Sequence, residues 1–259
     1  MAYTPKHITD DTEYFFPAEG FPPLPAFQPG GTPVVPIHEQ LKMAQPFDDA
    51  DKPQKTMTLP TVTLIGIDDI DPLGLLAVAK RCDDLCHFGE VKILTSWELA
   101  DHPWVVQIPD PINSLAEYSE FCIKRLADYV DTEYCLIVQR DGYILNTDAW
   151  TDEFLYFDYV GAVLPTGLVG NGGFSLRSRQ LLQLVRQHVL IGSFDPKDFN
   201  PEDQIICGRY RRMLQRLGVR FAPPELARRF ADNTDQTAAF GFHGVIRARM
   251  NSRKNHTLL

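Results

Sequence analysis

Short apolar runs alternate with longer amphipathic segments from Thr61 onward. Residues 61–67 (TVTLIGI) are β-branched and apolar over the length of a strand, whereas residues 73–88 (LGLLAVAKRCDDLCHF) repeat apolar side chains at helical spacing. The same pattern predicts further strands at 91–96, 104–109 and 134–139, and a helix at 115–129 that Asn113 and Ser114 can cap. Strands and helices therefore alternate along most of the chain.

This alternation predicts an α/β fold. Apolar strands separated by helices are typical of a Rossmann-type sheet that is mixed, mainly parallel and flanked by helices on both faces. Ligands of such sheets bind beyond the carboxyl ends of the strands. We therefore look for chemistry in the loops that follow the strands.

Residues 1–60 differ from this pattern. They hold about half of the 20 prolines, which prevents a long helix or a central strand, and they are rich in aromatic residues. We expect an extended arm that docks on the globular body or on a second copy in a homodimer, with simple disorder as the alternative. The folded domain is then 61–246, followed by a basic tail at 247–259 that contacts an acidic group or is only a solvated terminus.

Composition narrows the class of protein. The net charge of −9 and the pI near 5.2 argue against nucleic-acid binding. Apolar runs are too short for a membrane span, and the N-terminus lacks the pattern of a secretory signal. The five cysteines are scattered, with Cys82 and Cys86 on one face of the predicted helix, so we expect reduced thiols in a cytoplasmic protein.

Asp141 is the first candidate for chemistry. It follows the predicted strand at 134–139, in QRDG, where a carboxylate can hold a hard divalent cation. The alternative is that Asp141-Gly142 only makes a turn.

Three further candidates come later in the chain. Glu202 and Asp203 begin a helical pattern, where a carboxylate can act as a general base or can simply favour the helix dipole. His243 stands between two glycines, as a ligand-facing or a structural histidine. The glycine-rich stretch VGNGGFSLRS (169–178) lacks the GK[ST] of a P-loop and does not match GxGxxG after a first strand.

The order of these motifs resembles a family of glycosyltransferase-like domains with the glycosyltransferase-A fold. QRDG, AWTDEFLYFDYVGA, VGNGGFSLRS, PEDQIIC, VRFAPPELARRF and FGFHG occur in that order, and the resemblance covers about Thr61 to Gly244. It implies that Asp141 and His243 bind Mn²⁺ or Mg²⁺, and that Gln139 contacts the ribose or the sugar. Gln139 stands where the DxD motif of this fold has its first acid, so the metal site departs from the family pattern.

The resemblance also implies roles for the remaining candidates. Asp203 is the catalytic base, with Glu202 as second choice, and Asn171, Gly172 and Gly173 line the donor sugar, where missing side chains leave room. Asp69, beside Asp68, lies near the nucleotide, and Trp150 stacks on an acceptor sugar or is a buried aromatic.

The function expected from the resemblance is that of a metal-assisted inverting glycosyltransferase. It would move a sugar from a nucleotide-sugar donor of UDP type to a hydroxyl acceptor such as a glycan. Two alternatives stay open, a nucleotidyltransferase acting on sugar phosphates and an inactive carbohydrate- or nucleotide-binding module.

Overall fold

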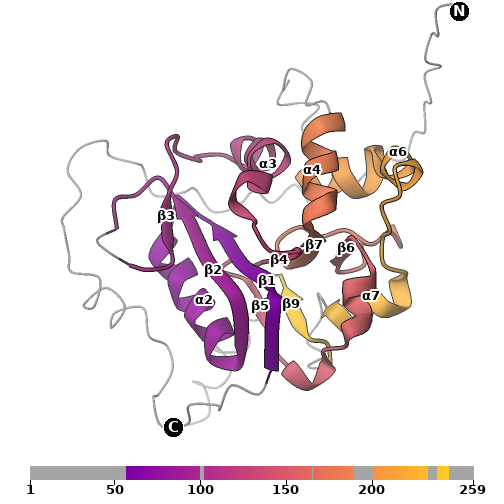
Figure 1. Cartoon of the computed structure of the whole chain (residues 1–259), viewed down its shortest axis with the longest axis horizontal. Helices are drawn as coiled ribbons and strands as arrows, with labels where there is room; N and C mark the ends of the chain where they lie inside the picture. Colours follow the sequence, from indigo (N-terminus) through magenta and orange to yellow (C-terminus); the bar gives the residue numbers. More distant parts are fainter. Residues whose placement is uncertain (1–56, 100–101, 165, 190–200, 233–237, 245–259) are drawn as a thin grey trace, which may run out of the picture. The chain divides into compact units, whose positions relative to one another are not determined.

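A mixed six-stranded sheet forms the centre of the described part of the chain (Figure 1). The computed structural model describes residues 57–99, 102–164, 166–189, 201–232 and 238–244. The strands are, in spatial order, β3 (Val105–Gln107), β2 (Cys86–Thr95), β1 (Met57–Ile67), β4 (Tyr134–Ile137), β7 (Ser175–Ser178) and β6 (Tyr159–Gly161). Strands β3, β2, β1 and β4 are parallel, and β7 is antiparallel to both of its neighbours. The predicted mixed, mainly parallel α/β sheet is confirmed.

Strand β1 begins at Met57, ahead of the predicted strand start at Thr61. Residues 57–60, expected in the proline-rich arm, therefore belong to the sheet. The pairing of β1 with β2 shifts register between Leu59 and Thr63. Pro60, which has no N–H to donate, lies in that irregular stretch. The rest of the arm and the basic tail lie outside the described residues, so their docking and the homodimer stay predictions.

The helix predicted at 73–88 extends too far at its C-terminal end. Helix α2 spans Pro72–Leu85, and β2 begins at Cys86. Cys86 pairs with Met57 and Phe88 with Leu59 in the parallel ladder, which extends β2 at the expense of the helix. The expectation that Cys82 and Cys86 share a helix face is therefore wrong.

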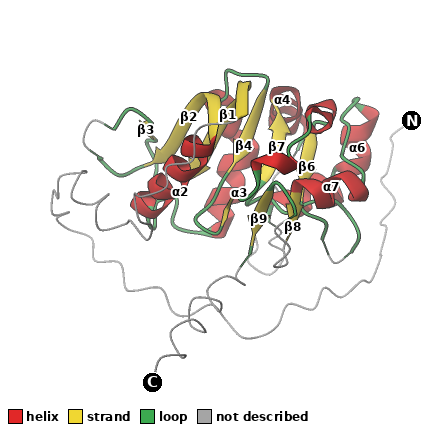
Figure 2. Ribbon diagram, turned by 90° about the horizontal axis from the view of Figure 1, so that it is seen from below, coloured by secondary structure: helices red, strands yellow, loops and turns green. Residues whose placement is uncertain are grey.

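Side chains of the central strands alternate between two apolar layers. Leu64 and Leu136 pack in a cluster with α2, whereas Ile65 and Ile137 pack in a cluster with α3 (Leu115–Lys124). Successive residues of a strand point to opposite faces, so a sheet that is apolar at every position must be covered twice. The central strands and their flanking helices are visible in Figure 2.

Helix α3 is shorter than the helix predicted at 115–129. It ends at Lys124 and is followed by the 3₁₀ helix η1 (Leu126–Tyr129). Its predicted cap at Ser114 is present, because Ser114 Oγ accepts a hydrogen bond of 3.2 Å from the N–H of Glu117.

A smaller sheet and several short helices complete the described residues. The small sheet has the order β5 (Gly142–Ile144), β9 (Gly241–His243) and β8 (Ala231–Asp232). The other elements are η2 (Thr147–Ala149), η3 (Asp152–Tyr156), α4 (Arg179–His188), α5 (Glu202–Gln204), η4 (Ile205–Arg209), α6 (Arg211–Arg216) and α7 (Pro224–Phe230). Because β5 follows β4 directly and pairs with β9, the end of β4 lies beside the FGFHG segment.

The strand order contains one switch point. From β1 the chain places β2 and β3 on one side, and it then places β4 on the other side. In parallel sheets the crevice beyond the carboxyl ends of two such strands is where ligands bind. The residues that follow β1 and β4 therefore lie where ligands of such sheets bind.

The cysteines and the helices bear on two expectations from composition. All five cysteines are buried and form no disulfide, which agrees with the expected reduced thiols. Among the described residues, no helix has both the length and the apolar character that crossing a bilayer requires.

Candidate functional site

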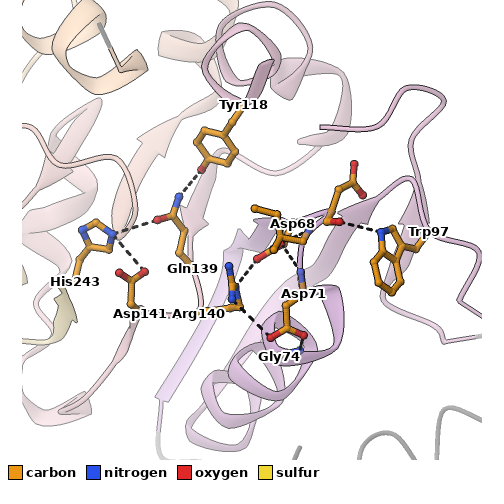
Figure 3. Close-up of polar contacts among 11 residues, drawn as sticks. Asp68, Asp71, Gly74, Trp97, Tyr118, Gln139, Arg140, Asp141 and His243 are labelled. Atoms are coloured by element: carbon orange, nitrogen blue, oxygen red, sulfur yellow. Dashed lines mark hydrogen bonds and ion pairs between the residues drawn. The ribbon is translucent and has the colours of Figure 1, made fainter. Parts of the chain in front are cut away.

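An ion pair joins the residues that follow β1 and β4 at the carboxyl edge of the sheet (Figure 3). Asp68 Oδ2 lies 2.7 Å from Nε of Arg140, and Asp71 Oδ2 lies 3.7 Å from its Nη1. The other oxygen of Asp68 accepts hydrogen bonds from the N–H groups of Ile70 and Asp71. The sequence analysis assigned no role to Arg140. Its position in the turn after β4, next to Asp141, could have indicated that it lies at the carboxyl edge of the sheet.

Asp69 is bound by the loop that follows β2 and by residue 112. Its Oδ1 accepts hydrogen bonds from Thr95 Oγ1 at 2.6 Å and from the N–H of Ser96 at 2.5 Å. Its Oδ2 accepts a bond of 2.6 Å from the N–H of Ile112. Both carboxylate oxygens are thus engaged within the protein, and a contact of Asp69 with a nucleotide stays a prediction.

The QRDG segment is a tight reversal between β4 and β5. Gln139 and Gly142 exchange two backbone hydrogen bonds of 3.0 and 2.9 Å, which leaves Arg140 and Asp141 as the turn residues. The Asp141 side chain is 51% exposed. The structural and the functional interpretation are therefore compatible, because the turn presents the carboxylate at the carboxyl edge of the sheet.

His243 of β9 lies against this turn. Its Nε2 is 3.1 Å from Gln139 Oε1 and 3.6 Å from Asp141 Oδ1 (Figure 3). Burial lowers the pKa of His243, and the charges of Asp141 and Asp203 oppose that shift. A histidine with a lowered pKa is neutral at pH 7, so it keeps a nitrogen lone pair that can bind a cation.

The glycine-rich segment packs against the same residues. Asn171 has a φ of 61°, in the left-handed region, and turns the chain toward Gly172 and Gly173. A Cβ on Gly173 would lie 2.1 Å from His243 Nε2 and 2.4 Å from Gln139 Oε1. Gly173 therefore permits the close approach of these two side chains.

Gly172 has a different neighbour from the one expected. A Cβ there would lie 2.0 Å from Glu202 Oε1 and 2.8 Å from Arg177 Nη2. The space that the missing side chain leaves is thus filled by a buried ion pair, and the expectation that it leaves room for a sugar ring needs correction. Any contact of Gly172 with a donor would have to come from its backbone.

Gly172→Ala is accordingly expected to destabilise the fold by about 3 kcal/mol, because the added methyl displaces a buried ion pair. Urea unfolding measures the change. Gly208→Ala is the matched control, because a Cβ on Gly208 meets no atom within 4 Å. Equal stability of the two variants would contradict the packing argument.

Glu202 is a buried partner of Arg177 in β7. Glu202 is 3% exposed and Arg177 is 0% exposed, and Arg177 Nη2 donates a 2.8 Å hydrogen bond to Glu202 Oε1. Ser119 of α3 accepts a bond from the N–H of Glu202. Burial raises the pKa of the Glu202 carboxyl, whereas Arg177 acts in the opposite direction. These contacts make Glu202 an anchor for the start of α5, and they leave it little access to a substrate.

Asp203, the next residue, is only partly buried. Its Oδ2 accepts a 3.3 Å hydrogen bond from the N–H of Gly172, and its Oδ1 accepts a 2.8 Å bond from the N–H of Gln204. Its charge acts on His243, so it belongs to the same electrostatic neighbourhood. Of the two predicted acids, Asp203 is the more exposed, and its role as a base stays a prediction.

A cation at this edge would have few protein ligands. Among the residues that the structure describes, no group of three or more His, Cys, Asp and Glu side chains is placed to hold a metal ion. Asp141 Oδ1 and His243 Nε2 are 3.6 Å apart, a separation that two ligands of one ion can have, and Gln139 Oε1 adds a neutral oxygen. Two side chains and one amide oxygen are thus the protein ligands that this edge could offer, and metal binding stays a prediction.

Trp150 lies within an aromatic cluster. Its ring centroid is 5.0 Å from that of Phe240 and 5.3 Å from that of Phe154. Its Nε1 donates a hydrogen bond to Asp152 Oδ1. Of the two interpretations of Trp150, packing is the one that these contacts support.

Most of the predicted site residues thus meet in one cluster. It consists of Gln139, Asp141, Asn171, Gly172, Gly173, Asp203 and His243, with Glu202 buried behind it and Asp69 apart from it. A family model described as "Protein of unknown function (DUF5672)" matches residues 105–244, more than half of the chain. The chain belongs to this family. The DUF5672 match includes the whole cluster and excludes β1 with Asp68 and Asp69.

Solved structures offer only distant likenesses to this DUF5672 member. One is a glycosyltransferase involved in the glycosylation of the major capsid of PBCV-1, with 14% identity and a TM-score of 0.45 over 75% of this chain and 98% of that chain. Another is protein A197 from STIV, with 14% identity and a TM-score of 0.31 over 63% and 82% of the two chains. Scores of this size do not establish a shared fold. No curated protein matches the sequence.

Proposed function

We propose that this protein is a metal-assisted inverting glycosyltransferase with a glycosyltransferase-A fold. It moves a sugar from a nucleotide-sugar donor of UDP type to a hydroxyl group of an acceptor such as a glycan. The observation that carries the proposal is the meeting of Gln139, Asp141, Asp203 and His243 near the end of β4, at the switch point of the strand order. The order of motifs, which resembles glycosyltransferase-like domains, supports the same function.

The charge balance at this edge of the sheet supports a cation-dependent reaction. Asp68, Asp71, Asp141 and Asp203 contribute negative charge there, and Arg140 pairs with the first two of them. A diphosphate would be repelled by this surplus unless a divalent cation came with it. A cation held by Asp141 and His243 would neutralise the charge that develops on the leaving diphosphate.

The chain's own groups have separate tasks in this proposal. Asp203 accepts the proton of the acceptor hydroxyl as that oxygen attacks the anomeric carbon. Its hydrogen bond from Gly172 N–H holds one oxygen in place and leaves other lone pairs for the acceptor. Asn171, Gly172 and Gly173 contact the donor sugar through backbone groups. Gln139 contributes its amide oxygen beside the diphosphate.

The experiment that tests the proposal couples the cation to the nucleotide. UDP at about 100 times its Kd should stabilise the protein by about 2.7 kcal/mol with Mn²⁺ present, and by much less without it. Asp141→Ala should abolish the effect of Mn²⁺, whereas the exposed Asp148→Ala should leave it unchanged. Thermal unfolding measures the stabilisation, and calorimetric titration of UDP with and without Mn²⁺ measures the coupling in each variant. The same Mn²⁺ dependence in the Asp141 variant would remove this residue from the site.

Turnover assays separate the proposed function from its alternatives. A glycosyltransferase releases UDP from a UDP-sugar, with an acceptor or slowly with water. A nucleotidyltransferase instead releases pyrophosphate from a nucleoside triphosphate and a sugar phosphate. Binding of Mn²⁺ and UDP with neither product would indicate an inactive binding module.

A further inference from the structure

Arginines are concentrated in one segment of the described chain. Residues 205–230, which hold η4, α6 and α7, contain seven arginines, no lysine and a single acid, Glu225. Their net charge is +6, so the rest of this chain of net charge −9 carries −15. Leu214 of α6 and Ala227 of α7 belong to one apolar cluster, so the two helices are neighbours (Figure 1). Positive charge is therefore gathered on one part of an acidic protein.

Three of the seven arginines have partners within the protein. One guanidinium lies 4.2 Å from an aromatic ring centroid, and two others form ion pairs with acids. These contacts are Arg211 with Phe221, Arg220 with Asp158, and Arg229 with Glu153. Packing and ion pairing account for these three, and they leave the arginines of η4 and the outer side of α6 to be explained.

Arg209, Arg212 and Arg216 form an exposed row, the arginine row, on η4 and α6. Their spacing of three and four residues places successive side chains on one side of the helical run, about 5 Å apart along its axis. All three are exposed, whereas Ile206 and Leu214 of the same run are buried. Within the described ranges no carboxylate pairs with any of the three, and the guanidinium of Arg209 only lies over the ring of the neighbouring residue 210.

Packing and helix electrostatics do not explain the arginine row. Like charges three or four residues apart on a helix repel each other. The helix dipole favours Arg209 and Arg216, which stand in the last turns of η4 and α6, but it gives no reason for Arg212 in the first turn of α6. An external anion would relieve this repulsion, so the row has the character of a binding surface.

Exposed leucines beside the arginine row indicate which anion it fits. Leu217 directly follows Arg216 and is 39% exposed. Leu168 is equally exposed and is next to Val169, whose carbonyl oxygen accepts a hydrogen bond from Arg211 of α6. Guanidinium groups bind phosphates, and apolar side chains enter the boundary between lipid headgroups and acyl chains. A nucleic acid or another dissolved polyanion would use only the arginines, whereas an anionic lipid surface uses both kinds of side chain.

We propose that the arginine row together with Leu217 is a docking surface for a membrane that contains anionic phospholipids. Lipid phosphates bind the guanidinium groups, and Leu217 enters the boundary between headgroups and acyl chains. A membrane is flat and contacts one side of the protein, so the acidic remainder can face away from it and is not brought against the anionic lipids. The docking surface is separate from the proposed sugar transfer and does not rest on it.

Cosedimentation of the full chain with phosphatidylcholine vesicles, with and without phosphatidylglycerol, tests this inference. We expect binding only to the anionic vesicles, and release when the ionic strength rises from about 0.1 to 1 M, which shortens the Debye length from about 10 to 3 Å. The combined variant Arg209→Gln, Arg212→Gln and Arg216→Gln should bind about 100-fold more weakly, because each arginine near an anionic surface contributes about a factor of 5. Binding of this variant at the wild-type level would overturn the inference.

The combined variant Lys80→Gln, Arg125→Gln and Arg179→Gln is the matched control. It removes the same charge from exposed positions on α2, at the end of α3 and on α4, and it should bind vesicles as wild type does. Circular dichroism and thermal unfolding verify that both combined variants are folded. Residues 247–259 are unchanged in both, so the basic tail cannot produce a difference between them. An equal loss in the two variants would show that net charge alone governs binding, and it would overturn the inference.

Substitution of leucine separates a membrane from a dissolved polyanion. Leu217→Ser should weaken vesicle binding about 2–5-fold, whereas Leu115→Ser, which alters a 56% exposed leucine on α3, should not. Equal binding by these two variants would contradict the insertion of Leu217. Tighter binding of single-stranded RNA or dextran sulfate than of anionic vesicles, lost in the arginine-row variant, would assign the row to a dissolved polyanion. Wild type that binds no anionic vesicles overturns the inference, whether or not it binds UDP and Mn²⁺.

Discussion

Replacing Asp203 with asparagine is expected to lower the rate of sugar transfer by about 10²–10⁴-fold, the usual contribution of a general base. Donor affinity should change little, because the substitution keeps the shape of the side chain and one accepting oxygen. The base must lie at the site and reach solvent, and Asp203 satisfies both conditions, since it accepts the N–H of Gly172 and is only partly buried. Transfer rate and donor binding are measured side by side.

The matched control for this prediction is Glu225→Gln. Glu225 also lies in a first helical turn, in α7 after two prolines, so it shares the helix-dipole environment without the neighbouring cluster. Its variant should transfer sugar at the wild-type rate. Near-normal transfer by Asp203→Asn would eliminate the assignment, and a loss of transfer confined to folded Glu202→Gln would move the role to Glu202.

Breaking the buried ion pair should have the largest effect on stability. Arg177→Met or Glu202→Leu is expected to cost about 3–5 kcal/mol, because each leaves one charge buried without a partner. The pair lies under the site, and Arg177 Nη1 already lacks a hydrogen-bond partner in the part of the chain that the structure describes. The double variant should recover most of the loss, since apolar side chains of similar size can replace a buried pair.

Urea unfolding with a surface pair as control measures this effect. Arg229 and Glu153 form an ion pair in which both side chains are 56% exposed. Arg229→Met should therefore change the free energy of unfolding by no more than about 1 kcal/mol. If Arg177→Met costs no more than Arg229→Met, the buried pair is not what holds the start of α5 in place.

Local patterns in the sequence determined the fold class and much of the candidate site. The apolar strands predicted the mixed, mainly parallel sheet, since a strand that is apolar at every position must be buried on both faces. Ser114 as a helix cap and QRDG as a reversal were also predictable, because caps and turns depend on a few neighbouring residues. The motif order by itself indicated Asp141, Asp203 and His243 as candidate site residues.

Partners that are distant in sequence were decided only by the tertiary structure. Cys86 lies in β2 and not in the predicted helix, because it pairs with Met57 of β1. Glu202 anchors the start of α5 because it forms a buried ion pair with Arg177. Position 172 requires glycine because this pair occupies the space that a Cβ would need.

The same holds for the centre of the site. Gln139 and His243 are 104 positions apart and meet through the pairing of β5 with β9, while Tyr118 of α3 contacts the other end of the Gln139 amide. Burial and ion pairing depend on which side chains share a volume. A pattern along one segment cannot contain that information, because the partner lies on another segment that only chain folding brings near.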